Sequence, residues 1–327
     1  MGLNLHCHLE GCVRPDTAAA IGAARGVPEP VGGWEAALRM RTPADLTVFL
    51  EHVAAAYPVM GFADALRRIA REAVEDAAGA GEDFLEIRFG PATHRRADLP
   101  IVDVIRAVRD GLADGSAATG IPTGLVICLL RHSDRDTNLE VAAAAAALAG
   151  DGVHGLDVAG DELRWPSNEP FVEAYRIAAA AGLGLTAHAA EASGPGAARE
   201  AAEWLGATRI GHGSHVADDP EVLAWAADHG LTFEVCATSN VYTGAARSLA
   251  KHPLHAFIAA GAGVVLGDDN PITIDRTLAD EERDLVAEGG LSPDVLRAIQ
   301  RRSVDVGFMD ESVRSRLREQ LAGLASP

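Results

Sequence analysis

Two histidines separated by one residue, His6 and His8, are the first residues in this chain whose spacing suggests chemistry. Apolar and polar residues alternate up to them, and a glycine-containing segment follows, which predicts a short strand ending in a loop. Alternate side chains of a strand share a face, so both imidazoles point the same way and could bind a divalent metal. Taken alone, an H-x-H motif is more often two unrelated histidines on a polar strand face. The question is whether the chain supplies the other half of a site.

The composition limits the classes of function. The chain has 327 residues, of which 48% are hydrophobic, and this suits one large α/β domain spanning residues 1–327. The formal net charge of -19 opposes binding to nucleic acid or to an anionic membrane, because phosphates would be repelled. The four cysteines form no C-x-x-C pair. Without a signal peptide or a long apolar run, we expect a cytoplasmic protein that acts on a small molecule.

Eight segments are predicted to be strands, and helical sequence follows each of them. Several are nearly continuous apolar runs, as parallel strands buried on both faces require. Extra helices are expected after the first strand, at 14–25, 34–40, 44–57 and 61–79, and at the C-terminus, at 276–288, 293–303 and 310–323. This pattern favours a (β/α)8 TIM barrel, with an open doubly wound sheet as the alternative. The predicted strands are 3–8, 83–91, 123–131, 153–160, 183–191, 208–215, 231–240 and 263–270.

Polar residues recur at the carboxyl ends of the predicted strands, where such a barrel has its active site. We expect His188 and Asp268 to complete a zinc site with the first two histidines, since three imidazoles and one carboxylate suit zinc. Taken singly, His188 could be a satisfied core histidine and Asp268 part of a turn before Pro271. The strand-end set is His6, His8, Arg88, Arg131, His132, Asp157, Asp161, His188, Glu191, His212, Ser239, Asn240, Asp268 and Asp269.

Two further residues suit proton transfer beside such a metal. Zinc lowers the pKa of a bound water to about 7, which makes a nucleophile available at neutral pH. Glu191 follows His188 by three residues, and its carboxylic acid could donate a proton to a ring nitrogen under attack. His212 lies between two glycines and could take the proton from the water. The alternatives are a solvated loop glutamate and a histidine in a glycine turn.

Together these residues resemble the adenosine deaminase family of the amidohydrolase superfamily. Five family motifs occur in family order, from residue 6 to residue 269. The set is specific, although no single motif is. The family's H-x-H, D-x-A-G-x-E, H-A-G-E, G-H-G and D-D motifs correspond here to residues 6–8, 157–162, 188–191, 211–213 and 268–269.

The resemblance implies zinc-dependent hydrolytic deamination of a 6-aminopurine, with one Zn²⁺ per chain. The implied zinc ligands are His6, His8, His188 and Asp268. Water would attack the purine C6, with its proton managed by His212 and Asp268. Ammonia would then leave. Contacts to the purine would come from Glu191 at N1, from the Gly160 N–H at N3 and from Asp269 at N7. His8 and Glu10 would also face the substrate, and Glu234 and Ser239 would support the site.

Departures from the family pattern leave the substrate open. Adenosine-specific members usually carry Asp where this chain has Glu10, whereas adenine and 6-aminodeoxyfutalosine deaminases often carry Glu. H-A-A-E replaces H-A-G-E, and Asn270 separates the paired aspartates from Pro271.

Other classes of protein fit the sequence less well. A binuclear amidohydrolase needs a bridging lysine at a central strand end, but the only lysine is Lys251. Zinc deaminases that edit nucleic acids need P-C-x-x-C, which this chain lacks. A purine-binding protein without turnover remains the alternative of a different class. The sequence predicts no oligomeric state.

Overall fold

Eight parallel strands pair in chain order in the computed structural model, which describes residues 1–324. The predicted (β/α)8 TIM barrel is therefore confirmed. The strands are β1 (Gly2–His8), β2 (Glu82–Phe89), β3 (Thr123–Leu130), β4 (Gly155–Ala159), β5 (Gly184–Ala189), β6 (Arg209–His212), β7 (Thr232–Val235) and β8 (Gly263–Leu266).

The barrel closes where the residues just after β8 meet β1. Asp269 pairs in parallel with Cys7. The Asp269 N–H donates to the His6 carbonyl at 2.8 Å, and the His8 N–H donates to the Asp269 carbonyl at 2.6 Å. These two bonds place Asp269 directly beside the H-x-H segment, although the two are more than 250 residues apart in the sequence.

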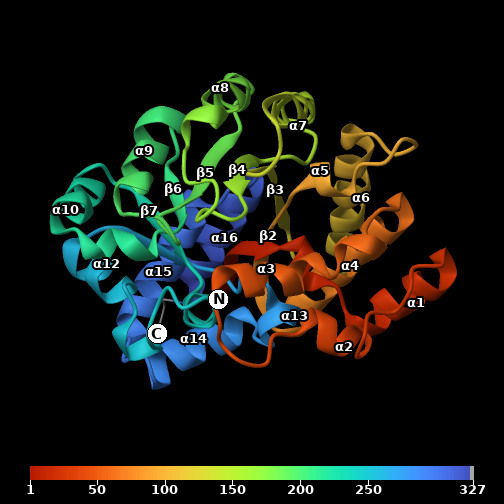
Figure 1. The fold of residues 1–327 in the computed structure, drawn as a ribbon. Coiled ribbons are helices and arrows are strands. Elements are labelled where there is room, and N and C mark those ends of the chain that lie inside the picture. Colours follow the sequence, from red (N-terminus) through yellow and green to blue (C-terminus); the bar gives the residue numbers. More distant parts are fainter. Residues whose placement is uncertain (325–327) are drawn as a thin grey trace.

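Helices surround the barrel, and Figure 1 shows α6, α7, α8, α9, α10 and α12 following one another around the strands. Their apolar faces and the outer faces of the strands form one large hydrophobic core. The helices are α1 (Pro15–Arg25), α2 (Gly33–Leu38), α3 (Leu46–Ala54), α4 (Ala63–Gly79), α5 (Pro91–His94), α6 (Ile101–Thr119), α7 (Arg135–Ala147), α8 (Val172–Ala180), α9 (Gly196–Leu205), α10 (Pro220–Asp228), α11 (Ala237–Tyr242), α12 (Leu254–Ala260), α13 (Pro271–Ile274), α14 (Leu278–Ala287), α15 (Pro293–Val306) and α16 (Glu311–Leu324).

The barrel interior is charged rather than apolar. Arg88 on β2 reaches Asp157 on β4 at 2.9 Å and Glu234 on β7 at 2.8 Å. Because β2 and β7 are not neighbours, these ion pairs cross the inside of the barrel. Arg209 on β6 bonds the other oxygen of Glu234 at 2.7 Å and also bonds Glu86. All five side chains are buried, so each charge is paired, as a buried charge must be to avoid a large desolvation cost.

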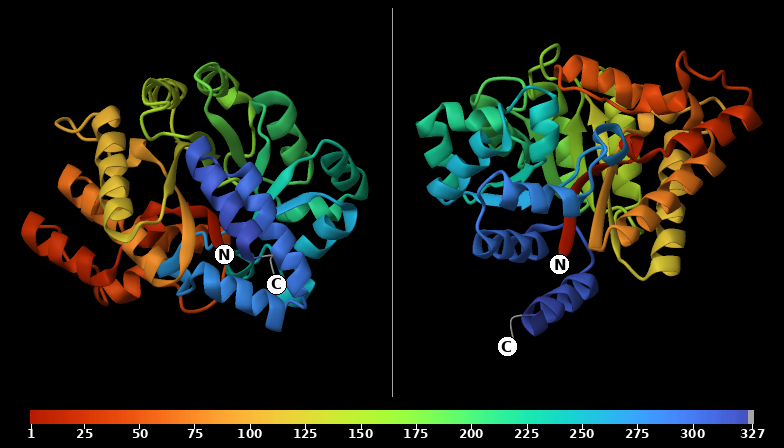
Figure 2. Two further views of the ribbon diagram at one scale, coloured as in Figure 1. Left: turned by 180° about the vertical axis from the view of Figure 1, so that it is seen from behind. Right: turned by 90° about the horizontal axis from the view of Figure 1, so that it is seen from below.

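Phe308 closes the end of the barrel away from the predicted site. A Cβ added to Gly124, Gly155 or Gly184 would come within 2.6 Å of Phe308, so glycine makes room for it on three neighbouring strands. The Arg209 guanidinium lies over the Phe308 ring, 3.7 Å from its centroid. Beyond it, α16 crosses this end of the barrel, as the view from behind in Figure 2 shows. The active-site chemistry is thereby confined to the opposite end.

Most predicted elements agree with the structure, and the main differences lie in the last two strands. Residues 237–242 form α11 instead of continuing β7, and β8 ends at Leu266 instead of reaching residue 270. The extra helices expected after β1 and at the C-terminus are present. None of the helices described within residues 1–324 combines the length and the apolar character needed to cross a bilayer.

Candidate active site

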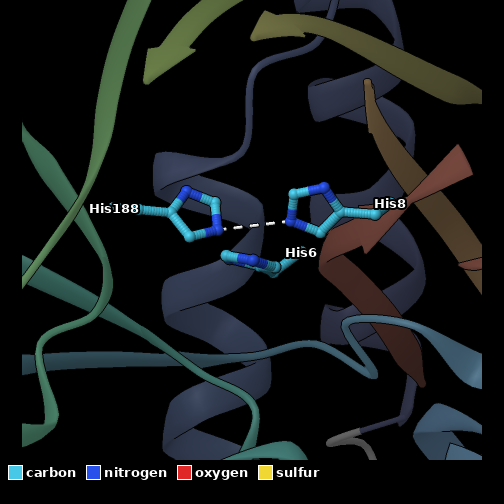
Figure 3. A group of neighbouring side chains, drawn as sticks. All are labelled: His6, His8 and His188. Carbon is cyan, nitrogen blue, oxygen red and sulfur yellow. Dashed lines mark hydrogen bonds between the residues drawn. The ribbon is translucent and has the colours of Figure 1, made fainter. Parts of the chain in front are cut away.

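Three histidines from two distant strands meet at the carboxyl end of the barrel. His6 and His8 come from β1, and His188 comes from β5. Figure 3 shows their imidazoles facing one another, with the Nε2 atoms of His8 and His188 3.2 Å apart. One ligand nitrogen from each of the three lies within 4.8 Å of the others. The half-site predicted from H-x-H therefore has its partner.

Carboxylates hold the far nitrogens of two of these rings. Nδ1 of His6 lies 2.7 Å from Oε2 of Glu234, and Nδ1 of His188 lies 2.9 Å from Oδ2 of Asp157. Each carboxylate favours a proton on Nδ1, which leaves Nε2 with a free lone pair. Nε2 of His6 is buried, and no hydrogen-bond partner for it lies among the described residues. Nitrogens of this kind, turned toward one point, fit a divalent metal.

Burial and neighbouring charge shift the pKa values of these groups. Burial alone would lower the pKa of His188, but the Asp157 carboxylate raises it. Burial, followed by the charge of Arg88, lowers the pKa of His6, and burial lowers the pKa of His8 to about 3. Burial alone would raise the pKa of Glu234, but the charges of Arg209 and Arg88 lower it. His6 and His8 are therefore neutral at physiological pH, and Glu234 is ionised.

Asp269 is the aspartate that joins the histidines. Its Oδ1 lies 3.7 Å from Nε2 of His6 and 3.6 Å from Nε2 of His8. Ser239 donates a hydrogen bond to its Oδ2. Asp269, His6 and His212 also form a second set of possible ligands within 4.8 Å.

Asp268, expected from the sequence as a metal ligand and proton carrier, lies elsewhere. It lines a separate cavity of about 720 Å³ together with Cys7, on the side of β1 opposite the imidazoles. The reason is local: Asp269 has φ 62° and the Asn270 N–H bonds the Asp268 carbonyl, so the alternation of the strand breaks between the two aspartates. The side chain that turns into the site is therefore that of Asp269.

Three non-glycine residues of the site have left-handed backbone conformations. They are Ala190 at φ 55°, His212 at φ 58° and Asp269 at φ 62°. Each lies at or shortly after the carboxyl end of a strand. Such conformations cost roughly 1–3 kcal/mol each and persist where the surrounding structure imposes them. At these positions they direct the chain, and with it His212 and Asp269, toward the histidine cluster.

Glu191 is held at the edge of the site by Glu162. The Glu162 carboxylate accepts hydrogen bonds from the backbone N–H groups of Ala190, Glu191, Ala192 and Ser193, at 2.8–3.1 Å. Burial raises the pKa of Glu191 to about 8. Glu191 is therefore protonated at neutral pH and can act as an acid.

His212 faces Glu191 from β6. Its Nε2 lies 3.7 Å from Oε1 of Glu191, and its Nδ1 lies 3.0 Å from the amide nitrogen of Asn240. Burial, followed by the charges of His188 and Arg88, lowers the pKa of His212. The structure thus brings His212 and Glu191 to the same cluster, as the sequence predicted.

A cavity of about 250 Å³ opens onto these residues. Gly160 and Glu10, both expected to contact substrate, line it. Glu10 accepts hydrogen bonds from Gly90 N–H at 3.0 Å and lies 3.3 Å from Nε2 of His94. Leu46, Phe49, Leu50 and Val53 on α3, with Tyr57 beyond it, add an apolar wall from the extra helices after β1.

Several residues of the site were not assigned roles from the sequence. Asn270 lines the cavity and donates a hydrogen bond from Nδ2 to Oδ1 of Asp269 at 2.8 Å. Arg88 contacts both Asp157 and Glu234, the carboxylates that contact His188 and His6. In the sequence, the only sign of this role is a charged residue within an apolar strand. Glu162 is the last residue of the D-x-A-G-x-E motif, but its hydrogen bonds to the segment 190–193 could not be predicted from the motif.

A model of the family described as adenosine deaminase matches residues 3–324. The chain belongs to the adenosine deaminase family. The adenosine deaminase of Serratia proteamaculans (strain 568) is 34% identical to this deaminase over 326 residues, covering 98% of this chain and 97% of the relative. The resemblance inferred from five motifs is therefore confirmed over nearly the whole chain.

Solved structures agree with this assignment. The adenine deaminase AAur1117 from Arthrobacter aurescens superposes with a TM-score of 0.89 at 25% identity, covering 99% of this chain and 98% of that one. A cog1816 amidohydrolase from Burkholderia ambifaria, solved with bound Zn, gives a TM-score of 0.89 at 26% identity, covering 99% and 90%. As a member of this family, the chain is a hydrolytic deaminase enzyme, and the family acts on small purines.

Proposed function

We propose that this enzyme uses one Zn²⁺ to remove the 6-amino group of a purine base or nucleoside by hydrolysis. The observation that carries the proposal is the pair of Nε2 atoms of His8 and His188, 3.2 Å apart and facing each other. Two ring nitrogens this close together need either a cation that both bind or a proton on one of them. The unpartnered Nε2 of His6 and the nearby Asp269 carboxylate favour the cation.

The ligand set we assign is His6, His8, His188 and Asp269. It replaces Asp268, the ligand expected from the sequence, by its neighbour. Three imidazoles and one carboxylate suit zinc, and the carboxylates on Nδ1 of His6 and His188 add to the basicity of these ligands. When bound, zinc acts as a Lewis acid and makes water nucleophilic near neutral pH.

The remaining residues bind and protonate the purine. Glu191, protonated at neutral pH, donates its proton to N1 as C6 is attacked. The backbone N–H of Gly160 binds N3. Asn270 takes the position at N7 that the family resemblance implied for Asp269, because its amide lies on the cavity wall and can donate a hydrogen bond at any pH near neutrality.

The cavity favours an uncharged substrate over a nucleotide. No arginine or lysine is among the described residues that line it, so a phosphate would have no charged partner there. Oε2 of Glu10 is buried and has no hydrogen-bond partner among the described residues. The pKa of Glu10 is lowered: burial alone would raise it, but a hydrogen bond from His94 lowers it. This ionised acceptor suits a sugar hydroxyl or the N9–H of a free base.

The experiment is a spectrophotometric comparison of adenosine, deoxyadenosine, adenine, 6-aminodeoxyfutalosine and AMP with the zinc-loaded enzyme and with the same enzyme after chelation. We expect turnover of at least one uncharged purine, its loss on chelation and its return with Zn²⁺. Turnover that persists without metal would refute the zinc dependence. No turnover of any uncharged purine would favour the alternative of a purine-binding protein without activity.

We propose that the enzyme works in the cytoplasm as a single-domain chain spanning residues 1–327, on a free purine and not on nucleic acid or at a membrane. The net charge of -19 supports the exclusion of polyanions.

A further inference from the structure

A buried chain of hydrogen bonds runs behind His212, away from the metal site. The Leu254 N–H donates to Nδ1 of His252 at 3.0 Å. Nε2 of His252 lies 3.1 Å from Oδ1 of Asn240, and Nδ2 of Asn240 lies 3.0 Å from Nδ1 of His212. The three side chains are each at most 2% exposed, so water does not compete for these bonds. The sequence had placed only His212 and Asn240 near the site.

The first bond fixes the proton on His252. A backbone N–H can only donate, so Nδ1 of His252 must present a lone pair to Leu254. Burial lowers the pKa of His252 to about 3, which leaves the ring neutral with a single proton. That proton must lie on Nε2, where it is donated to Asn240.

The second bond fixes the orientation of the Asn240 amide. With Nε2–H of His252 as donor, the atom of Asn240 facing it must be the carbonyl oxygen. The reverse orientation would set the amide N–H₂ against another N–H, with two donors and no acceptor in a dry site. The amide nitrogen therefore faces His212 and donates to its Nδ1.

We propose that His252 and Asn240 are positioning residues that hold neutral His212 in the tautomer with its proton on Nε2. Because Nδ1 of His212 accepts from the amide, the nitrogen that faces the site, 3.7 Å from Glu191, carries the proton. The backbone N–H of Leu254 therefore sets which atom donates and which accepts in every bond of this hydrogen-bond relay, which runs through His252 and Asn240 to His212. His212 thus presents a donor to the reacting centre and not the lone pair that a base would need.

The chemical consequence rests on the proposed function. As the water oxygen bonds to C6, the electron pair of the C6–N1 double bond moves to N1, which takes the proton of Glu191. The proton lost by the water passes to the Asp269 carboxylate, while His212 donates a hydrogen bond to the attacking oxygen. The proton on Asp269 then passes to the amino group, the C6–N bond breaks and ammonia leaves. The C6 hydroxyl becomes a carbonyl as its proton returns to the Glu191 carboxylate. The sequence expectation that His212 takes the water proton is revised.

The test reads the tautomer directly, without substrate. The full-length, zinc-loaded enzyme is labelled with ¹⁵N-histidine, and ring nitrogens are assigned as protonated or bare by their NMR shifts and couplings. We expect His212 and His252 both to carry their proton on Nε2. A spectrum of the wild-type protein with the His212 proton on Nδ1 would overturn the inference without touching the proposed deamination.

Asn240→Asp reverses one link of the relay. A carboxylate only accepts, so it should draw the His212 proton to Nδ1 and leave His252 unchanged. With the donor lost, we expect kcat to fall by about 10²–10³-fold while KM and zinc content change little. An unchanged His212 tautomer in this variant would contradict the proposal.

His252→Phe removes the group that orients Asn240, and His255→Phe is its matched control. His255 lies three residues away and bonds the Leu249 carbonyl, outside the relay. We expect mixed tautomers of His212 in the first variant and the wild-type tautomer in the second. Equal spectra for the two variants would show that His252 has no part in orienting His212. If His252→Phe does not fold, the wild-type and Asn240→Asp spectra still decide the question.

Discussion

Nδ1 of His6 lies 2.7 Å from Oε2 of Glu234, and Arg88 contacts that same carboxylate oxygen at 2.8 Å. His6 on β1 is thus oriented by Glu234 on β7, and Glu234 is in turn held by Arg88 on β2. Arg88 also contacts Asp157, the partner of His188. A single guanidinium therefore supports two imidazoles that we assign as zinc ligands, and the barrel interior acts as their common support.

Glu234→Gln should weaken zinc binding. Without the carboxylate, Nδ1 of His6 loses its ionic acceptor and two arginines lose a counter-charge, so we expect about 10–100-fold lower zinc affinity. The measurement is competition with a chromophoric chelator. Glu72→Gln, a buried glutamate remote from the site that accepts from Thr17, is the control and should bind zinc as the wild type does. Equal affinities of the two variants would contradict the support role of Glu234.

Asp269→Asn and Asp268→Asn should behave differently although they are neighbours. The first removes the carboxylate that faces the Nε2 atoms of His6 and His8, and we expect loss of tight zinc binding and of activity. The second alters a residue in the separate cavity and should retain both. Metal content after dialysis and kcat on the best purine give the comparison. If Asp268→Asn alone lost its metal, the assignment expected from the sequence would have been right.

Glu191→Gln should keep fold and metal but lower kcat by about 10²–10⁴-fold, because an amide cannot donate the proton that N1 needs. In the wild type, the neutral acid exists below the raised pKa of about 8 and is lost above it. Activity that depends on this acid should therefore decline as pH rises through that pKa. Near-normal turnover of the variant would refute the role of Glu191.

Gly11→Ala should disturb Asn270 and with it substrate binding. A Cβ at position 11 would lie 2.2 Å from Oδ1 and 2.6 Å from Cα of Asn270, so the side chain and its backbone must shift. We expect a higher KM with zinc content unchanged, measured by steady-state kinetics and metal analysis. Gly79→Ala, with no atom within 4 Å of the added carbon, is the control. A KM raised equally in both variants would rule out this explanation.

Glu281 should make stability depend on pH. Burial raises its pKa to about 8 in the folded protein, against 4.5 for an ordinary glutamate. The folded state therefore binds this proton more tightly, and the resulting stabilisation is complete below pH 4.5 and is lost as pH rises to 8. Each unit of pKa shift corresponds to about 1.4 kcal/mol.

Glu281→Gln removes this dependence while its amide oxygen can still accept from Thr238 N–H. Relative to the wild type, the variant should gain stability between pH 6 and pH 9 in urea unfolding. The exposed Glu288→Gln on the same segment should show no such gain. A difference between wild type and Glu281→Gln that stays constant with pH would show that burial of Glu281 carries no such penalty.

Much of the fold and of the site could be predicted because both depend on local patterns. Apolar runs followed by helical periodicity predicted all eight strands, and the alternation of a strand placed His6 and His8 on one face. His188, Glu191 and His212 were found because they follow predicted strands directly, and the carboxyl ends of parallel strands meet. The ends of β7 and β8 were placed too late, because the point at which the pairing of these two strands stops depends on contacts between them and not on the local sequence.

The sequence by itself determined the barrel, the three histidines and the family, since these follow from the order of residues along the chain. Only the tertiary structure decided that Asp269 and not Asp268 joins the histidines, because that choice depends on a left-handed residue and on pairing with Cys7 across the barrel closure. It alone also decided the proton on His212, because the polarity of a hydrogen-bond chain is set by a backbone N–H 42 residues away in the sequence. Contacts between distant residues have no local pattern from which to predict them.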